Sequence, residues 1–100
     1  MSRHIALSVN NKPIELDYFV QGFIDHTSGG IVEALEGTGK IKTLRISIEA
    51  NEVKITLNNI IVPVNPFVSK IIKNTILGMV SSLKGVAKIN QLEIDIERTD

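Results

Sequence analysis

The chain has 100 residues, the length of one domain with a hydrophobic core of its own. Eleven basic and eleven acidic side chains give a formal net charge of zero, so the positive excess that drives phosphate binding is absent. The chain has no cysteine, which excludes disulfides, thiolate catalysis and cysteine metal sites. We therefore expect a single ordered domain, residues 1–100, that does not bind nucleic acid.

The sequence also lacks hydrophobic segments of the length used for targeting or for crossing membranes. The N-terminus has too few apolar residues before Asn10 for a signal-peptide core. No window reaches the roughly 18 consecutive apolar residues that a membrane span needs. We therefore expect no membrane span and a cytoplasmic location.

The first residues predict a strand and a turn. Ile5, Leu7 and Val9 alternate with small or polar residues, which is the period of a half-buried strand. The turn is expected at residues 10–12, because asparagine tolerates a positive φ. A short edge strand at residues 13–16 remains an open alternative to a loop.

Residues 18–36 have the pattern of an amphipathic helix with Asp17 as its N-cap. The predicted buried stripe consists of Val20, Phe23, Ile24, Thr27, Ile31, Ala34 and Leu35. Gly29 and Gly30 together cost on the order of 2 kcal/mol relative to alanine, which leaves a break in this helix open. The outer face is expected to carry Gly22, His26, Gly29 and Glu33.

Residues 41–58 predict an antiparallel hairpin. Apolar and polar residues alternate on both sides of a two-residue turn at Ala50 and Asn51, which places the aliphatic side chains on one face. Such a turn pairs Ile48 with Val53, Ile46 with Ile55 and Leu44 with Leu57. The sheet is therefore dry on one face, and the flanking helices must cover that face.

The remaining segments predict an apolar run at residues 60–64, a second helix and a last strand. Asn65 is the expected N-cap, Pro66 occupies the first helical position, and Gly85 is expected to end the helix. The predicted buried stripe is Val68, Ile72, Thr75, Ile76, Met79 and Leu83. In the last strand, Leu92, Ile94 and Ile96 alternate with acidic residues.

The resulting order β-α-β-β-α-β is typical of an α+β two-layer sandwich with two helices on one face of an antiparallel sheet. This order matches the ferredoxin-like, or split βαβ, plan. A strand at residues 13–16 would add an N-terminal hairpin to the plan. The two halves share this architecture, but we expect no sequence repeat between them.

Three motifs invite a catalytic or binding interpretation, and each lacks a required feature. Residues 37–40 lack the first glycine and the final serine or threonine of a phosphate loop. Residues 25–28 hold the residue types of a hydrolase triad, but consecutive helical side chains point about 100° apart. His4 faces solvent without the spacing of a metal site. We expect no catalytic, metal or cofactor-binding residues, and an enzyme using His26 or His4 is the least favoured alternative.

Surplus apolar surface is the feature that indicates a function, because exposed apolar patches commonly mark contact surfaces. The candidate interface residues are Phe67, Ile71, Leu77, Ile61, Val64, Gly22 and Gly29. We expect a small non-catalytic binding or interaction domain that forms a homodimer. The alternative is a domain that binds a small apolar or amphipathic ligand between helices and sheet. The biological process and the identity of the partner stay open.

Overall fold

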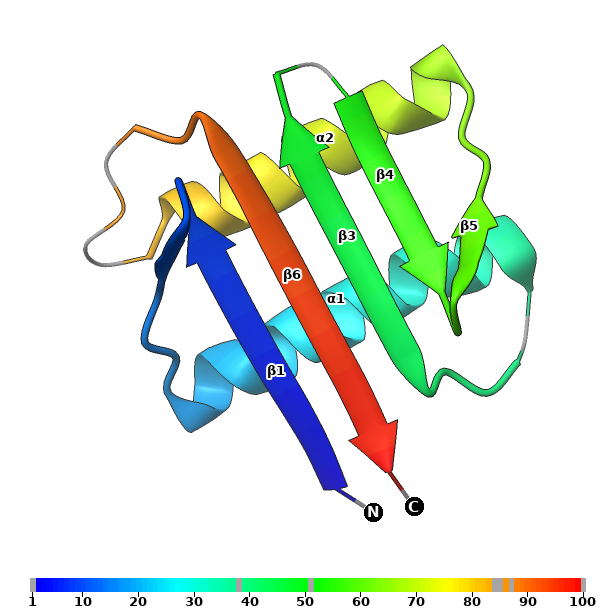
Figure 1. Ribbon diagram of the computed structural model, residues 1–100, viewed down its shortest axis with the longest axis horizontal. Helices are drawn as coiled ribbons and strands as arrows, with labels where there is room; N and C mark the ends of the chain where they lie inside the picture. Colours follow the sequence, from blue (N-terminus) through cyan, green and yellow to red (C-terminus); the bar gives the residue numbers. More distant parts are fainter. Residues whose placement is uncertain (1, 38, 51, 84–85, 87, 100) are drawn as a thin grey trace.

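The chain folds into two layers, a sheet and a pair of helices (Figure 1). The computed structural model describes residues 2–37, 39–50, 52–83, 86 and 88–99. Helices α1 (Tyr18–Glu36) and α2 (Pro66–Ser81) cover one face of a six-stranded antiparallel sheet. The strands are β1 (Ser2–Val9), β2 (Lys12–Pro13), β3 (Thr43–Glu49), β4 (Glu52–Leu57), β5 (Ile60–Val62) and β6 (Gln91–Thr99). The predicted α+β architecture is confirmed.

The central hairpin has the register expected of a two-residue turn. Strands β3 and β4 pair Ile48 with Val53, Ile46 with Ile55 and Leu44 with Leu57. Ala50 in the turn has a φ of 55°, and Asn51 lies outside the described residues. Ile46, Ile55, Ile72 and Ile94 are all buried in one core cluster. Alternation in the sequence therefore identified the inner face of the sheet correctly.

The strand order is β2-β1-β6-β3-β4-β5, with β6 paired antiparallel to both β1 and β3. In a ferredoxin-like sheet, the second hairpin strand lies between the two strands that flank the first helix. Here the last strand takes that place, so the ferredoxin-like order is not confirmed. Strands β4 and β6 both run antiparallel to β1 and β3, and hydrophobic alternation alone does not distinguish the two insertions.

Both helices begin where the capping residues predict. The Asp17 and Asn65 side chains each accept a hydrogen bond of 2.8 Å, from the backbone N–H of Val20 and Val68 respectively. Pro66 occupies the first turn of α2, where its missing N–H leaves no helical hydrogen bond unmade. Side-chain capping thus fixes the start of each helix next to the sheet.

The ends of the predicted elements differ from expectation in small ways. Helix α1 is unbroken, so Gly29 and Gly30 do not interrupt it. Helix α2 ends at Ser81, and Gly85 lies outside the described residues. The edge strand is limited to Lys12–Pro13 rather than residues 13–16. The two apolar residues that follow it, Ile14 and Leu16, pack partly buried against the core.

The buried face of α1 is rotated from the predicted one. Its buried residues are Ile24, Asp25, Ser28, Gly29 and Val32. Phe23 and Ala34 were expected inside but are exposed. The apolar pattern misled here because a carboxylate, a serine and a glycine face the sheet. Asp25 is stabilised there by two arginines from the strands.

The two halves of the chain repeat one sequence, contrary to expectation. At an offset of 48 residues, 16 of the 48 positions in residues 2–49 are identical to their counterparts in residues 50–97. The identical pairs, given by the first member, are Asn10, Asn11, Phe19, Val20, Ile24, Thr27, Gly30, Val32, Leu35, Gly37, Lys40, Ile41, Leu44, Ile46, Ile48 and Glu49. No gap is needed, so each residue has one counterpart.

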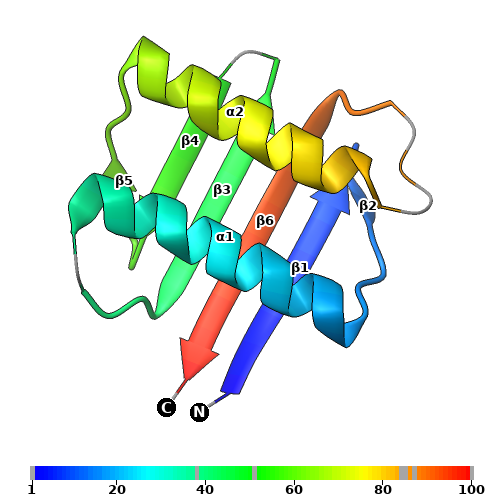
Figure 2. The same ribbon diagram turned by 180° about the vertical axis from the view of Figure 1, so that it is seen from behind.

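The sheet has the same two-fold pattern as the sequence. Its order pairs β2, β1 and β6 on one side with β5, β4 and β3 on the other. Strands β3 and β6 meet at the centre, where Ile46 lies opposite its own counterpart Ile94. The pseudo-two-fold axis therefore passes next to this pair. Figure 2 shows the matching result for the helices, which lie side by side and run antiparallel across the sheet.

Single hydrogen bonds obey the same symmetry. The Asn10 carbonyl side-chain oxygen accepts from the N–H groups of Asn90 and Gln91 at 2.8 and 3.0 Å. The counterpart Asn58 accepts from Lys42 and Thr43 at the same distances, 2.8 and 3.0 Å. Both asparagines have positive φ, 53° and 49°, a region that asparagine tolerates well. Asn10 thus connects the β1–β2 turn to the start of β6, and Asn58 connects the β4–β5 turn to the start of β3.

Candidate functional site

The outer side of the helix layer carries most of the exposed apolar surface. In the described part of the chain, five of the seven exposed large hydrophobic side chains belong to the helices. Phe19 and Phe23 lie one turn apart on α1, with ring centroids 6.0 Å from each other. Phe67 and Ile71 lie one turn apart on α2. These side chains face away from the sheet, although transfer from water favours their burial.

The two helices present the same stripe at equivalent positions. Phe19 and Phe67 are 73% and 71% exposed, and Phe23 and Ile71 are 50% and 49% exposed. One turn further lie Thr27 and its counterpart, and then a glycine in each helix. We call this surface the helical face; it consists of Phe19, Phe23, Thr27, Gly30, Phe67, Ile71, Thr75 and Gly78. None of these residues is charged.

The helical face contains two exposed glycines, Gly30 and Gly78. A Cβ atom added to Gly30 or to Gly78 would meet no other atom within 4 Å. Glycine inside a helix is nevertheless less favourable than alanine by about 1 kcal/mol. Both repeats therefore keep a residue that weakens the helix without relieving a contact in the chain. A close approach by something outside the chain would account for it.

A groove runs along the helical face between the helices. Its volume is about 570 Å³, and its lining residues come from the N-terminal half of α1 and the C-terminal half of α2. Because the helices are antiparallel, the aromatic end of one lies beside the small residues of the other. The lining residues are Phe19, Val20, Phe23, Thr27, Thr75, Gly78, Met79, Ser82 and Leu83. The groove is therefore almost wholly apolar.

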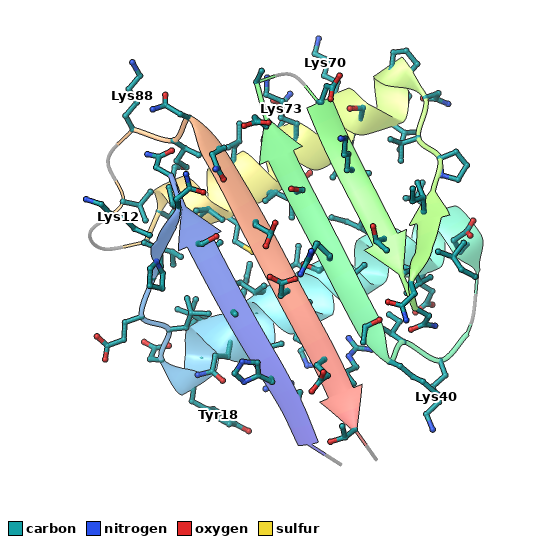
Figure 3. All side chains as sticks on the ribbon, in the orientation of Figure 1. Lys12, Tyr18, Lys40, Lys70, Lys73 and Lys88 are labelled. Carbon is teal, nitrogen blue, oxygen red and sulfur yellow. The ribbon has the colours of Figure 1, made fainter. Side chains whose placement is uncertain are left out.

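Charged side chains surround this face rather than enter it. Figure 3 shows Lys12, Lys40, Lys70 and Lys88 at the periphery of the molecule, where their ends point outward. On α1, His26 and Glu33 lie exposed beside the stripe. The arrangement is an apolar centre with a charged rim, which resembles the layout of protein interfaces.

The structure separates the candidate interface residues predicted from the sequence. Phe67 and Ile71 belong to the helical face. Ile61 is 77% exposed but lies on β5, the edge strand of the sheet. Leu77 and Val64 are only half-exposed, because they pack against the core. Phe23 was missed as a surface residue because it was assigned to the buried stripe of α1, and Phe19 was not named as an interface candidate.

Gly22 and Gly29 line two separate hollows, one beside Phe19 and Phe23 and the other beside Gly30 and Glu33. Gly29 is buried, and an arginine nitrogen of Arg98 lies 2.7 Å from the position its Cβ would take. Gly22 is half-buried, and Nη2 of Arg3 lies 3.1 Å from the position that a Cβ atom of Gly22 would take. These glycines make room for arginines from the chain's own strands.

The two arginines bind one buried carboxylate. Arg3 donates to Asp25 Oδ2 at 3.1 Å, and Arg98 donates to Oδ1 from Nη2 at 2.7 Å and from Nε at 2.9 Å. The Asp25 side chain is only 5% exposed. Ser28 is buried one turn later, and its hydroxyl has no hydrogen-bond partner in the described part of the chain. The cluster holds α1 against the ends of β1 and β6, next to both termini.

The two histidines and the carboxylate of Asp25 have different environments in the structure. His4 and His26 are both exposed, and the Asp25 carboxylate is fully engaged by arginines. No three His, Cys, Asp or Glu side chains gather as metal ligands in that part of the chain. In the hypothetical triad at positions 25–28, Asp25 and Ser28 are buried on the same side of α1, whereas the intervening His26 is exposed.

The open face of the sheet is polar. Arg45 donates to Asp95 Oδ1 at 2.7 Å, and Glu93 lies 3.9 Å from the same guanidinium nitrogen. The pKa of Glu93 is raised, first by burial and then by its hydrogen bond to Asp95 and the charge on Asp95; Arg45 opposes this rise. No aromatic side chain is present on the strands, so the face offers no platform for stacking bases.

Replacing Glu93 with glutamine is expected to stabilise the fold slightly at neutral pH, within about 0.5 kcal/mol. A raised pKa means that the folded state holds the Glu93 proton more tightly than the unfolded state does. Stability is therefore lost as pH rises through that pKa. Below about pH 4 the carboxyl is protonated in both states, and the gain should disappear. Urea melts of both chains at several pH values check this, and a gain that grew towards low pH would contradict it.

No helix among the described residues is long and apolar enough to cross a membrane. Comparisons with protein-family models, with curated proteins and with solved structures gave no match.

Proposed function

We propose that the chain is a small non-catalytic interaction domain that acts by self-association, with two copies packing helical face against helical face. The observation that carries the proposal is the repeated stripe. Both helices expose two large hydrophobic residues and a glycine at equivalent positions, with closely matched exposure of the hydrophobic side chains. A monomer gains nothing from either feature.

A second copy suits this face in shape. The aromatic end of α1 lies beside the small residues of α2, so a two-fold contact would let a phenyl ring of one copy lie over a glycine of the other. Glycine has a hydrogen atom where alanine has a methyl group, and its small size permits helix backbones to approach closely. Zero net charge leaves little electrostatic opposition to such a contact.

The size of the face is sufficient for a small dimer. The 19 residues of α1 extend about 28 Å at about 1.5 Å per residue. Two helices, each about 10 Å wide, then offer roughly 550 Å² per chain. Burial of this face on both copies removes about 1,100 Å² from water, just above the roughly 1,000 Å² expected of a biological interface. We therefore expect a dimer of moderate affinity.

An apolar ligand in the groove is the second candidate. Its volume of about 570 Å³ falls in the range of small-molecule sites. The space between helices and sheet, where the sequence placed such a ligand, is filled by core side chains such as Ile24 and Ile76, which are 0% exposed. A ligand would thus occupy the outer side of the helices, the same surface that dimerisation would cover.

Replacing both Gly30 and Gly78 with alanine is expected to have opposite effects on folding and on association. The helices should gain about 1 kcal/mol at each site, because nothing in the chain opposes the added methyl groups. The same methyl groups should hold two copies apart and raise the dimer dissociation constant about tenfold or more, equivalent to about 1.4 kcal/mol. Urea melts measure the first effect and sedimentation equilibrium the second.

Glu33→Ala is the matched control, since Glu33 is exposed on α1 but lies outside the helical face. Its dissociation constant should equal that of the parent. An unchanged dissociation constant in the double glycine variant would contradict the dimer. Binding of an apolar dye to a monomeric parent, lost in that variant, would instead support the ligand.

A further inference from the structure

The contact between the two halves of the chain has the form of a homodimer interface. Residues 2–49 contribute β1 and β3, and residues 50–97 contribute β4 and nearly all of β6. Within the sheet, β1 pairs with β6, β3 with β4 and β3 with β6, so each of these three pairings joins the two halves. The strands of one half do not pair with each other except at the short hairpins β1–β2 and β4–β5.

These pairings are reciprocal, as an isologous contact requires. Leu44 lies opposite Ile96, and the counterparts Leu92 and Ile48 lie opposite each other as well. The β1–β6 register has the same offset as the β4–β3 register: His4 pairs with Glu97, and the counterpart pair is Glu52 with Glu49. A single surface therefore meets its own copy along the whole sheet.

We infer that the chain is a fused pair of self-binding units of about 48 residues, and that the interface partner of each unit is a second copy of the same unit. The inference does not depend on the proposed dimer, which uses the opposite side of the helices. It predicts that the order of the units along the chain is immaterial. It also predicts that two copies of one unit, joined in a single chain, form the complete sheet.

We expect the second unit to be the one that can pair with a second copy of itself. The charged cluster of the first unit has no equivalent there: Ser28 and Gly29 correspond to Ile76 and Leu77, which pack in or against the core. Asp25 depends on Arg98, which follows the second unit and is therefore absent from a chain of two first units. A chain built from two copies of the second unit would thus place apolar side chains against the strands at these positions. Two first units would leave Asp25 with only one of its two arginines.

The first test exchanges the order of the units in the full chain. A permutant begins at Glu52, joins Thr99 to Ser2 through an Asn-Gly turn, and ends at Ala50; Ser2 and Thr99 already pair, and both termini lie together (Figure 1). It should unfold in one transition at a urea midpoint close to that of the parent. A control with the same link but opened between Asn10 and Asn11 cuts a unit and its hydrogen bonds, and should have a lower midpoint.

The second test places residues 50–97 twice in succession, followed by residues 98–100. The junction between the two copies then has the native Glu-Ala-Asn-Glu turn sequence, and the junction with residues 98–100 is that of the parent. The doubled chain should fold and, because its units are related by two-fold symmetry, give about half as many backbone amide NMR signals as the parent. Its matched control, residues 2–49 twice, should have a lower urea midpoint. A permutant whose urea midpoint is no higher than that of the Asn10-cut control would contradict the inference. A doubled second unit that is disordered would contradict it as well.

Discussion

Replacing Asp25 with alanine is expected to lower the free energy of unfolding by about 3 kcal/mol. The change removes the shared partner of Arg3 and Arg98 and leaves two guanidinium groups partly buried without it. Breaking a buried pair in this way usually costs about 3–5 kcal/mol. The lower end applies because the arginine side chains are still 26% and 25% exposed. Urea unfolding followed by circular dichroism measures the loss.

The control for this prediction is an ion pair of equal length on the surface. Arg45 and Asp95 also meet at 2.7 Å, but their side chains are 60% and 40% exposed. Exposed pairs contribute about 0–1 kcal/mol, so Asp95→Ala should be nearly neutral. Equal losses of unfolding free energy in the two variants would show that burial of the Asp25 carboxylate does not determine how much its ion pairs stabilise the fold.

Replacing Ile46 or Ile94 with alanine is expected to lower the free energy of unfolding by about 2–5 kcal/mol. Both side chains are 0% exposed, and they face each other across the central strand pair. Because the two residues are counterparts on the pseudo-two-fold axis, the losses should agree within about 1 kcal/mol, within the usual scatter of such substitutions. Their effects should not simply add in the double variant, since the residues share one pocket in the core.

Ile61→Ala serves as the control for these core substitutions. Its side chain is 77% exposed, and a surface change of this kind should stay within about 0.5 kcal/mol. A loss at Ile46 several times larger than the loss at Ile94 would contradict the symmetry of the core. Thermal and urea melts of the four chains provide this comparison.

The sequence was sufficient to predict the elements whose causes are local. Alternation placed the β3–β4 register correctly, and the capping residues Asp17 and Asn65 marked the starts of both helices. Such features depend on neighbours within a few residues. The position of β6 between β1 and β3 depends on distant partners, and local patterning contains no information about it.

The face of α1 was predicted wrongly because only apolar residues were counted as buried. Asp25 faces the sheet owing to Arg3 and Arg98, which lie near opposite ends of the chain. The repeat held the missing signal. Phe23 aligns with Ile71, which was correctly assigned to the surface from the pattern of α2. Transferring that assignment through the alignment would have placed Phe23 on the helical face.

The most direct test of the proposed function is the mass of the unmodified chain in solution. Light scattering behind size exclusion, from low to high micromolar concentration, should give a mass approaching twice the 11.0 kDa of one chain. The mass should fall towards that of one chain on dilution, as a reversible contact of about 1,100 Å² would require. A constant 11.0 kDa across the whole range would contradict self-association through the helical face.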